Sequence, residues 1–122
     1  MDAYERGMVT RREVLGDAHV DRAVAATDDL DAGFQRWITE NVWNGVWSRP
    51  NLDRRTRSLV TIAILASLGA DELRLHLEAA TNTGTTPEEI AEVLMHVGVY
   101  AGVPAAHSAF KLAKEIHGGT DD

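Results

Sequence analysis

The residues best suited to acid–base chemistry are His76 and Glu72, in the segment LGADELRLHLEAATNTGTTPEE. On a helix Leu73, Leu77 and Ala80 would share one stripe with His76, so the imidazole would lie on an apolar face one turn from a carboxylate. A carboxylate and burial act on an imidazole in opposite directions, which leaves it able to exchange a proton near neutral pH. On the pattern alone, a core histidine bonded to Glu72 or to a backbone carbonyl is the commoner case.

A cluster of arginines is the second feature with chemical potential. Positive charge at a helix N-terminus opposes the helix dipole, so helix stability does not explain the cluster. Arg54 and Arg57 are three positions apart and share a face, whereas Arg55 points elsewhere. The cluster predicts an anion site, and a solvated helix start is the alternative. Its members, in SRPNLDRRTRS, are Arg49, Arg54, Arg55 and Arg57.

Aromatic side chains lie near these arginines in the sequence. Trp37, Trp43 and Trp47 are typical of core or subunit-interface packing, and a water-excluding pocket wall is the alternative. Farther along, His107 borders an apolar stripe, so we expect it to face a pocket or a neighbouring subunit. The stripe consists of Ala106, Ala109, Phe110 and Ala113.

A metal site is not expected. Glu-x-x-x-His occurs at 72–76 and at 92–96, whereas carboxylate-bridged di-iron bundles use Glu-x-x-His together with further inward carboxylates. We interpret His96 as a surface partner of Glu92.

Composition limits the functional classes. The 122 residues fit one domain, and the absence of cysteine excludes disulfides, thiolate ligands and thiol nucleophiles. A net charge of −7 argues against nucleic acid, including helix-turn-helix DNA reading, and against anionic membranes. The apolar run at 59–68 is far shorter than the roughly 20 residues that span a bilayer, and the charged start has no signal-peptide pattern. We therefore expect a cytoplasmic protein.

The elements that must position these residues are predicted to be helices throughout. Thr10 and Glu13 resemble a capping box for a short helix that ends near Gly16. A second helix covers 17–26, and a third starts after Asp28 or Asp29 and stops at the Asn44-Gly45 turn pair.

The later helices have clearer boundaries. A helix from Asp53 to about Gly69 is apolar on every side and is predicted to be the central one. The helix that carries His76 starts at Asp71 and ends at 82–84. The next begins at Thr86-Pro87-Glu88-Glu89, and the last runs from 102–104 to 118–119. We expect a single domain over 1–122, with N-terminal helices and a loop at 1–52, a helical core at 53–117 and a tail at 118–122.

Taken together, these segments resemble the carboxymuconolactone decarboxylases. The likeness rests on RRTRSLVTIAILASLGADELRLHLEAATNTGTTPEEIAEVLMHVGVYAGVPAAHSAF, on YERGMVTRREVLGDAHVDRA and on VWSRPNLDRR. Related alkylhydroperoxidase-like proteins use a Cys-x-x-Cys pair before a histidine that would match His76. The cysteine positions fall near Gly69 and Glu72, so a chain without cysteine cannot perform the peroxidase chemistry. His107 departs from the pattern, which has asparagine in GVPAANSAF.

The resemblance implies an all-helical homo-oligomer, a trimer or hexamer, that binds a small dicarboxylate lactone and uses no cofactor. The implied reaction is decarboxylation of 4-carboxymuconolactone to 3-oxoadipate enol-lactone in protocatechuate breakdown. His76 with Glu72 would supply the proton, and the substrate would be held by Arg49, Arg54, Arg57, Trp47, Tyr100 and His107. The alternatives are another small-acid lyase or lactone isomerase on the same scaffold, and a helical assembly protein without catalysis.

Overall fold

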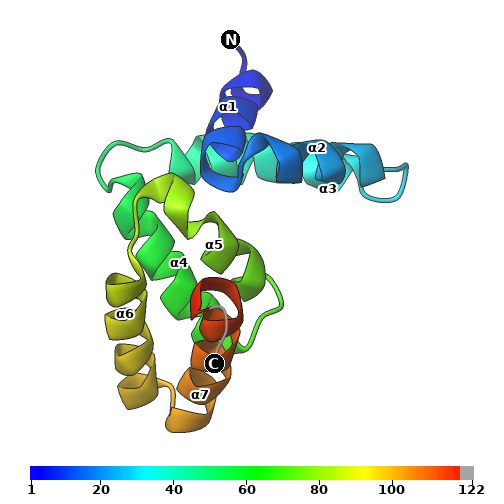
Figure 1. Cartoon of the computed structure of the whole chain (residues 1–122). Coiled ribbons are helices and arrows are strands. Elements are labelled where there is room, and N and C mark those ends of the chain that lie inside the picture. The colour runs from blue at the N-terminus through cyan, green and yellow to red at the C-terminus, as the bar shows by residue number, and fades with distance from the viewer. Residues whose placement is uncertain (119–122) are drawn as a thin grey trace. The chain divides into compact units, whose positions relative to one another are not determined.

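The computed structural model describes residues 1–118, and every regular element within them is helical, as predicted (Figure 1). The chain divides into two compact units, Met1–Arg54 and the part from Arg55 onward. The expectation of one domain over the whole chain stays a prediction. Of the predicted tail at 118–122, Gly118 is the last residue of a helix, and residues 119–122 lie outside the described residues.

The first unit contains four helices: α1 (Ala3–Leu15), α2 (Asp17–Ala26), α3 (Ala32–Ile38) and the π-helix η1 (Thr39–Trp47). The α1 helix starts at a capping box in which Asp2 Oδ1 accepts from the Glu5 amide at 2.8 Å. The prediction that Thr10 opens this helix was wrong. Thr10 matches the same four-residue pattern, but it is buried in mid-helix with its Oγ1 2.8 Å from Ser48 Oγ.

The segment around Asn44-Gly45 also differs from the prediction, because it stays helical through Trp47. The rings of Trp43 and Trp47 are both buried, with centroids 5.1 Å apart. Burial of two indoles outweighs the turn preference of an Asn-Gly pair. Trp37, in contrast, is 55% exposed, so the three tryptophans do not form one cluster.

Helices α1 and η1 are in close contact at Gly7 and Thr39. Thr39 is fully buried, and its Oγ1 donates to the Gln35 carbonyl at 2.7 Å. A Cβ at Gly7 would overlap the carbonyl of Thr39, so only glycine allows this approach.

The second unit is built from α5 (Leu73–Ala79), the 3-10 turn η2 (Ala80–Thr83), α6 (Pro87–Tyr100), α7 (Val103–Ala113), the π-helix η3 (Lys114–Gly118) and nearly all of α4 (Arg54–Leu68). The predicted Thr86 start is confirmed, since Thr86 and Glu89 form a capping box. The predicted ends near Gly69 and Gly84 are confirmed as well, and both glycines have positive φ values of 64° and 82°.

A hydrophobic core joins the helices of this unit. Helix α4 contributes one side only, through Ile62 and Ala66, while Val60, Ile64 and Leu68 on its other sides are exposed. The apolar residues on every side predicted α4 to be the central helix, and within the single chain only one of its sides is buried. The buried core consists of Ile62, Ala66, Leu73, Leu77, Ala80, Ile90, Leu94, Val97, Ala109 and Ala113.

Among the described residues, no helix is both long enough and apolar enough to cross a membrane.

Candidate active site

His76 lies on α5 beside the buried leucines Leu73 and Leu77, as the apolar stripe predicted. Its side chain is half-buried, and Nδ1 is the buried ring nitrogen. An imidazole with one nitrogen inside and part of the ring at the surface can take or deliver a proton at a ligand.

Hydrogen bonds hold the end of the His76 helix against α4. Ser58 Oγ and Thr83 Oγ1 are 2.7 Å apart and join α4 to η2. Thr85 Oγ1 donates to the Ala80 carbonyl at 2.8 Å. Gly84, which lies between Thr83 and Thr85, has the left-handed backbone conformation. These contacts fix where α5 ends and therefore where His76 stands.

Glu72 immediately precedes α5 and is exposed. Its backbone carbonyl accepts the His76 amide at 3.2 Å, which sets the two residues one helical turn apart. The side-chain pairing of Glu72 with His76 stays a prediction. On the same helix, Arg74 Nη2 is 2.7 Å from Glu115 Oε1, so an ion pair ties α5 to η3.

Two of the clustered arginines belong to the second unit and differ in their surroundings. Arg55 pairs with Glu89, the residue that caps α6, so Arg55 has a structural role. Arg57 is half-buried with its Nε inside the protein. Of the two, Arg57 has the burial expected of a substrate-binding arginine.

Three predicted substrate-binding residues lie in the first unit or at its end. Arg54 Nη1 is 2.5 Å from Glu13 Oε1 and Arg54 Nη2 donates to Thr10 Oγ1 at 3.4 Å, so this arginine already has a carboxylate partner. Arg49 is exposed, and Trp47 is buried against Trp43. The packing interpretation of Trp47 therefore fits its position in this unit.

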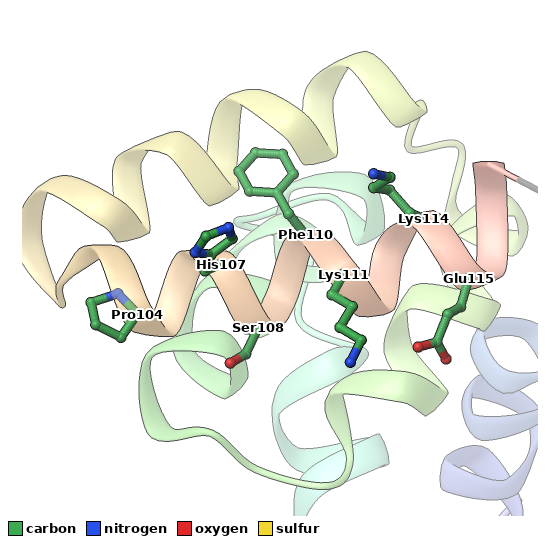
Figure 2. A pocket seen from close by; sticks show the side chains of 7 residues that line it. All are labelled: Pro104, His107, Ser108, Phe110, Lys111, Lys114 and Glu115. Atoms are coloured by element: carbon green, nitrogen blue, oxygen red, sulfur yellow. The ribbon is translucent and has the colours of Figure 1, made fainter. Parts of the chain in front are cut away.

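His107 and Tyr100 are both exposed and line different hollows. His107 borders a hollow of about 1100 Å³ along α7, where Figure 2 shows His107, Phe110 and Lys114 on one side of the helix. Tyr100 is 81% exposed, and its ring centroid is 5.0 Å from that of His96. It lines a groove of about 310 Å³ between α4 and α6.

Within residues 55–118, His107 and Tyr100 line two separate hollows. His76 lines neither the His107 hollow nor the Tyr100 groove. The grouping of His76 with arginines and aromatic walls stays a prediction.

Sequence reasoning also missed three cations. Lys111 and Lys114 are the only lysines of the chain, and both line the His107 hollow. Lys114 follows His107 by seven positions, a helical spacing that was visible in the sequence. Arg11 is buried in α1, and an Arg-Arg doublet carries no signal of burial.

Comparison with known proteins places the chain among decarboxylases. The model of the carboxymuconolactone decarboxylase family matches residues 32–115. A 4-carboxymuconolactone decarboxylase of Acinetobacter baylyi is 47% identical over 114 residues, which cover 93% of this chain and 85% of that protein.

Two further relatives carry decarboxylase names. The nitrosuccinic acid decarboxylase npaB of Metarhizium robertsii is 38% identical over 107 residues, which cover 87% of this chain and 75% of that protein. A 4-carboxymuconolactone decarboxylase of Pseudomonas putida is 50% identical over 38 residues, which cover 31% of this chain and 79% of that sequence.

Proposed function

The chain belongs to the carboxymuconolactone decarboxylase family, and on that premise we propose that it converts 4-carboxymuconolactone to 3-oxoadipate enol-lactone and CO2 in protocatechuate breakdown. The observation that carries the proposal is the similarity to the Acinetobacter baylyi decarboxylase along nearly the whole chain. The half-buried imidazole on α5 is the group that suits the chemistry.

The substrate contains its own electron sink. Loss of CO2 from the ring carbon leaves an electron pair that the ring double bond conjugates to the lactone carbonyl. The resulting dienolate then takes a proton at the carbon next to the carbonyl, which gives the enol-lactone. The protein has to hold the anionic substrate, stabilise the developing oxyanion and deliver one proton.

We assign proton delivery to His76. The imidazole gives its proton to the dienolate carbon and regains one from solvent, while Glu72 orients the ring. The apolar side chains around α5 favour the step, because a carboxylate that leaves as neutral CO2 loses its charge there.

We assign the substrate's carboxylates to arginines, whose planar fork binds carboxylate with two parallel hydrogen bonds. Arg57 has the most suitable burial, and Arg49 is exposed. Arg54 would bind a substrate carboxylate while it keeps its ion pair with Glu13. In this proposal Trp47 and Tyr100 form walls and His107 adds a polar contact.

The direct test is a turnover assay without metal. Purified protein in chelator-treated buffer is expected to consume 4-carboxymuconolactone and to release one CO2 for each enol-lactone, because the reaction needs no external electron sink. Ultraviolet absorbance follows the lactone, and heat-denatured protein gives the spontaneous rate. No loss of lactone above that rate would contradict the proposal and favour another small-acid lyase or a lactone isomerase.

Nitrosuccinate is the second candidate substrate, because the Metarhizium robertsii relative is named a nitrosuccinic acid decarboxylase. Both names describe loss of CO2 from a small acid with more than one carboxylate. The same CO2 assay with nitrosuccinate decides between them through the ratio of kcat/KM values.

We also propose that the chain assembles into a homo-oligomer, a trimer or hexamer. Helices α4 and α6 expose aliphatic side chains that a solitary soluble domain would bury, and Val99 is 73% exposed. On these two helices the exposed apolar residues are Val60, Ile64, Leu68, Met95, Val99 and Tyr100, and Val103 at the start of α7 is exposed as well. The cytoplasmic location predicted from the sequence stays a prediction.

Replacing Val99 with lysine is expected to break this assembly. A buried ammonium without a partner is costly at an interface and harmless at an exposed surface. Light scattering is expected to give a multi-chain mass for the wild type and a single-chain mass for Val99→Lys, with unchanged circular dichroism. Glu92→Lys, an exposed change on the same helix, is the control and should keep the wild-type mass. A wild-type mass of one chain would contradict assembly.

A further inference from the structure

Arg11 is a buried cation that the mechanism above does not use. It is only 6% exposed in the middle of α1. Its Nη1 donates to Thr39 Oγ1 at 3.4 Å and its Nη2 to Gln35 Oε1 at 3.1 Å, and both acceptors are neutral. Its Nε is buried without an acceptor, and among residues 1–118 no carboxylate pairs with it.

Other arginines of the same unit are neutralised. Arg12 pairs with Asp17 and Asp21 at 3.1 and 2.9 Å, and these hydrogen bonds, that of Asp21 first, raise its pKa above the ordinary value. Arg36 pairs with Glu40. Arg11 is the opposite case, because burial lowers its pKa, and nearby Arg12 lowers it further while Tyr4 raises it. A guanidinium stays protonated in proteins, so Arg11 is a buried charge that lacks a counter-ion.

The backbone next to Arg11 is closely packed. Gly7 lies one turn before it and sets the close approach of α1 to Thr39, the first residue of η1. Gln35 is only half-buried, so the guanidinium end lies near the surface of the unit.

We infer that Arg11, with Gln35 and Thr39, forms a carboxylate-binding site in the first unit, and that, if the proposed function holds, it binds the carboxylate that the substrate keeps. The Nε–H and the neighbouring Nη–H form the side-on pair that grips a carboxylate with two hydrogen bonds. The Gln35 amide supplies a third donor. The retained carboxylate has the same charge before and after loss of CO2, so this site acts on binding more than on the chemical step.

A binding test uses adipate, a six-carbon dicarboxylate, with adipamide as the neutral control at matched ionic strength. Adipate is expected to raise the melting temperature of the wild type by several degrees, whereas adipamide is not. Arg11→Met is expected to melt at or above the wild type without ligand, because a buried unpaired charge is removed. It should gain nothing from adipate. Arg22→Met, an exposed change in the same unit, is the matched control and should respond like the wild type.

A kinetic test follows the lactone. Arg11→Met is expected to raise KM by roughly 10- to 100-fold with kcat within about threefold of the wild type, because the lost hydrogen bonds serve both ground state and transition state. Arg11→Lys keeps the positive charge but lacks the planar guanidinium, so its KM should lie between those of the wild type and Arg11→Met. A fall in kcat alone, with unchanged KM, would overturn the assignment.

The outcomes separate this inference from the proposed function. If the wild type binds adipate through Arg11 but does not convert the lactone, the proposed reaction is contradicted and the carboxylate-binding site is supported. Equal stabilisation of wild type and Arg11→Met by adipate would overturn the site. A third result would also overturn the site: adipate does not stabilise the wild type, and the Arg11→Met variant has a smaller oligomer mass than the wild type. In that case the counter-ion of Arg11 would be a carboxylate from a second copy of the chain.

Discussion

The His76→Gln variant is expected to fold and assemble like the wild type and to lose about 10²- to 10⁴-fold in kcat, the usual contribution of a positioned proton donor. Glutamine keeps a polar side chain of similar size beside Leu73 and Leu77, so the core of the second unit is preserved. Its amide does not deliver a proton to a carbanion. Steady-state kinetics with 4-carboxymuconolactone measure the loss.

The pattern of the loss identifies the role. A proton donor acts in the transition state, so kcat and kcat/KM should fall together while KM changes little. His19→Gln, a histidine in the first unit without a proposed role, is the matched control and should keep full turnover. A His76→Gln variant with wild-type kcat would rule out His76 as the donor.

A second substitution separates catalysis from packing. His76→Leu removes a polar ring from an apolar stripe, so its free energy of unfolding is expected to equal or exceed that of the wild type. A catalytic His76 predicts loss of turnover despite this stability. A helical assembly protein without catalysis predicts the same stability and no reaction in the wild type.

Sequence patterns predicted local structure well where one residue type fixes the backbone. Thr86 with Glu89 forms the predicted capping box, and Gly84 ends the His76 helix with a positive φ. Both signals act within four residues, so no tertiary information is needed. The stripe of Leu73, Leu77 and Ala80 likewise follows from helical periodicity, and all three are buried.

The failures occurred where distant contacts override local preference. Thr10 matches a capping box, but its hydroxyl meets Ser48 and α1 begins at Asp2. The Asn44-Gly45 pair stays helical because burial of Trp43 and Trp47 dominates. A pattern of four residues carries no information about a residue far away in the sequence that will contact it. Where two segments match a helix-start pattern equally well, tertiary packing decides which of them starts the helix.

The candidate site was predictable in part for the same reason. The position of His76 on α5 follows from spacing, whereas its grouping with arginines depends on contacts far apart in the chain. The burial of Arg11 depends on the approach of α1 to η1 at Gly7, which no charge pattern encodes. Apolar residues on every side of α4 indicated burial, and in the single chain Ile64 and Leu68 are exposed. If the proposed oligomer forms, we expect a second chain to cover these exposed side chains of α4.

The approach at Gly7 leads to the largest stability prediction. Gly7→Ala is expected to lower the free energy of unfolding by about 3 kcal/mol, because the new Cβ would overlap a backbone carbonyl that no rotamer change can move. Helix α1 must then shift away from η1, and Thr39 and Arg11 lose their fixed spacing. Urea denaturation followed by tryptophan fluorescence suits this test, since all three tryptophans lie in the first unit.

Gly33→Ala is the matched control, in the first turn of α3 with open space around its Cβ position. Alanine is a better helix former than glycine, so this variant is expected to gain about 0.5–1 kcal/mol. The two substitutions add the same methyl group to the same unit, so opposite signs would isolate the α1–η1 contact as the cause. If Arg11 binds carboxylate, Gly7→Ala should also weaken adipate binding at urea concentrations where the variant is still folded. Equal free energies of unfolding for the two variants would contradict the close approach of α1 to η1, on which the Arg11 site depends.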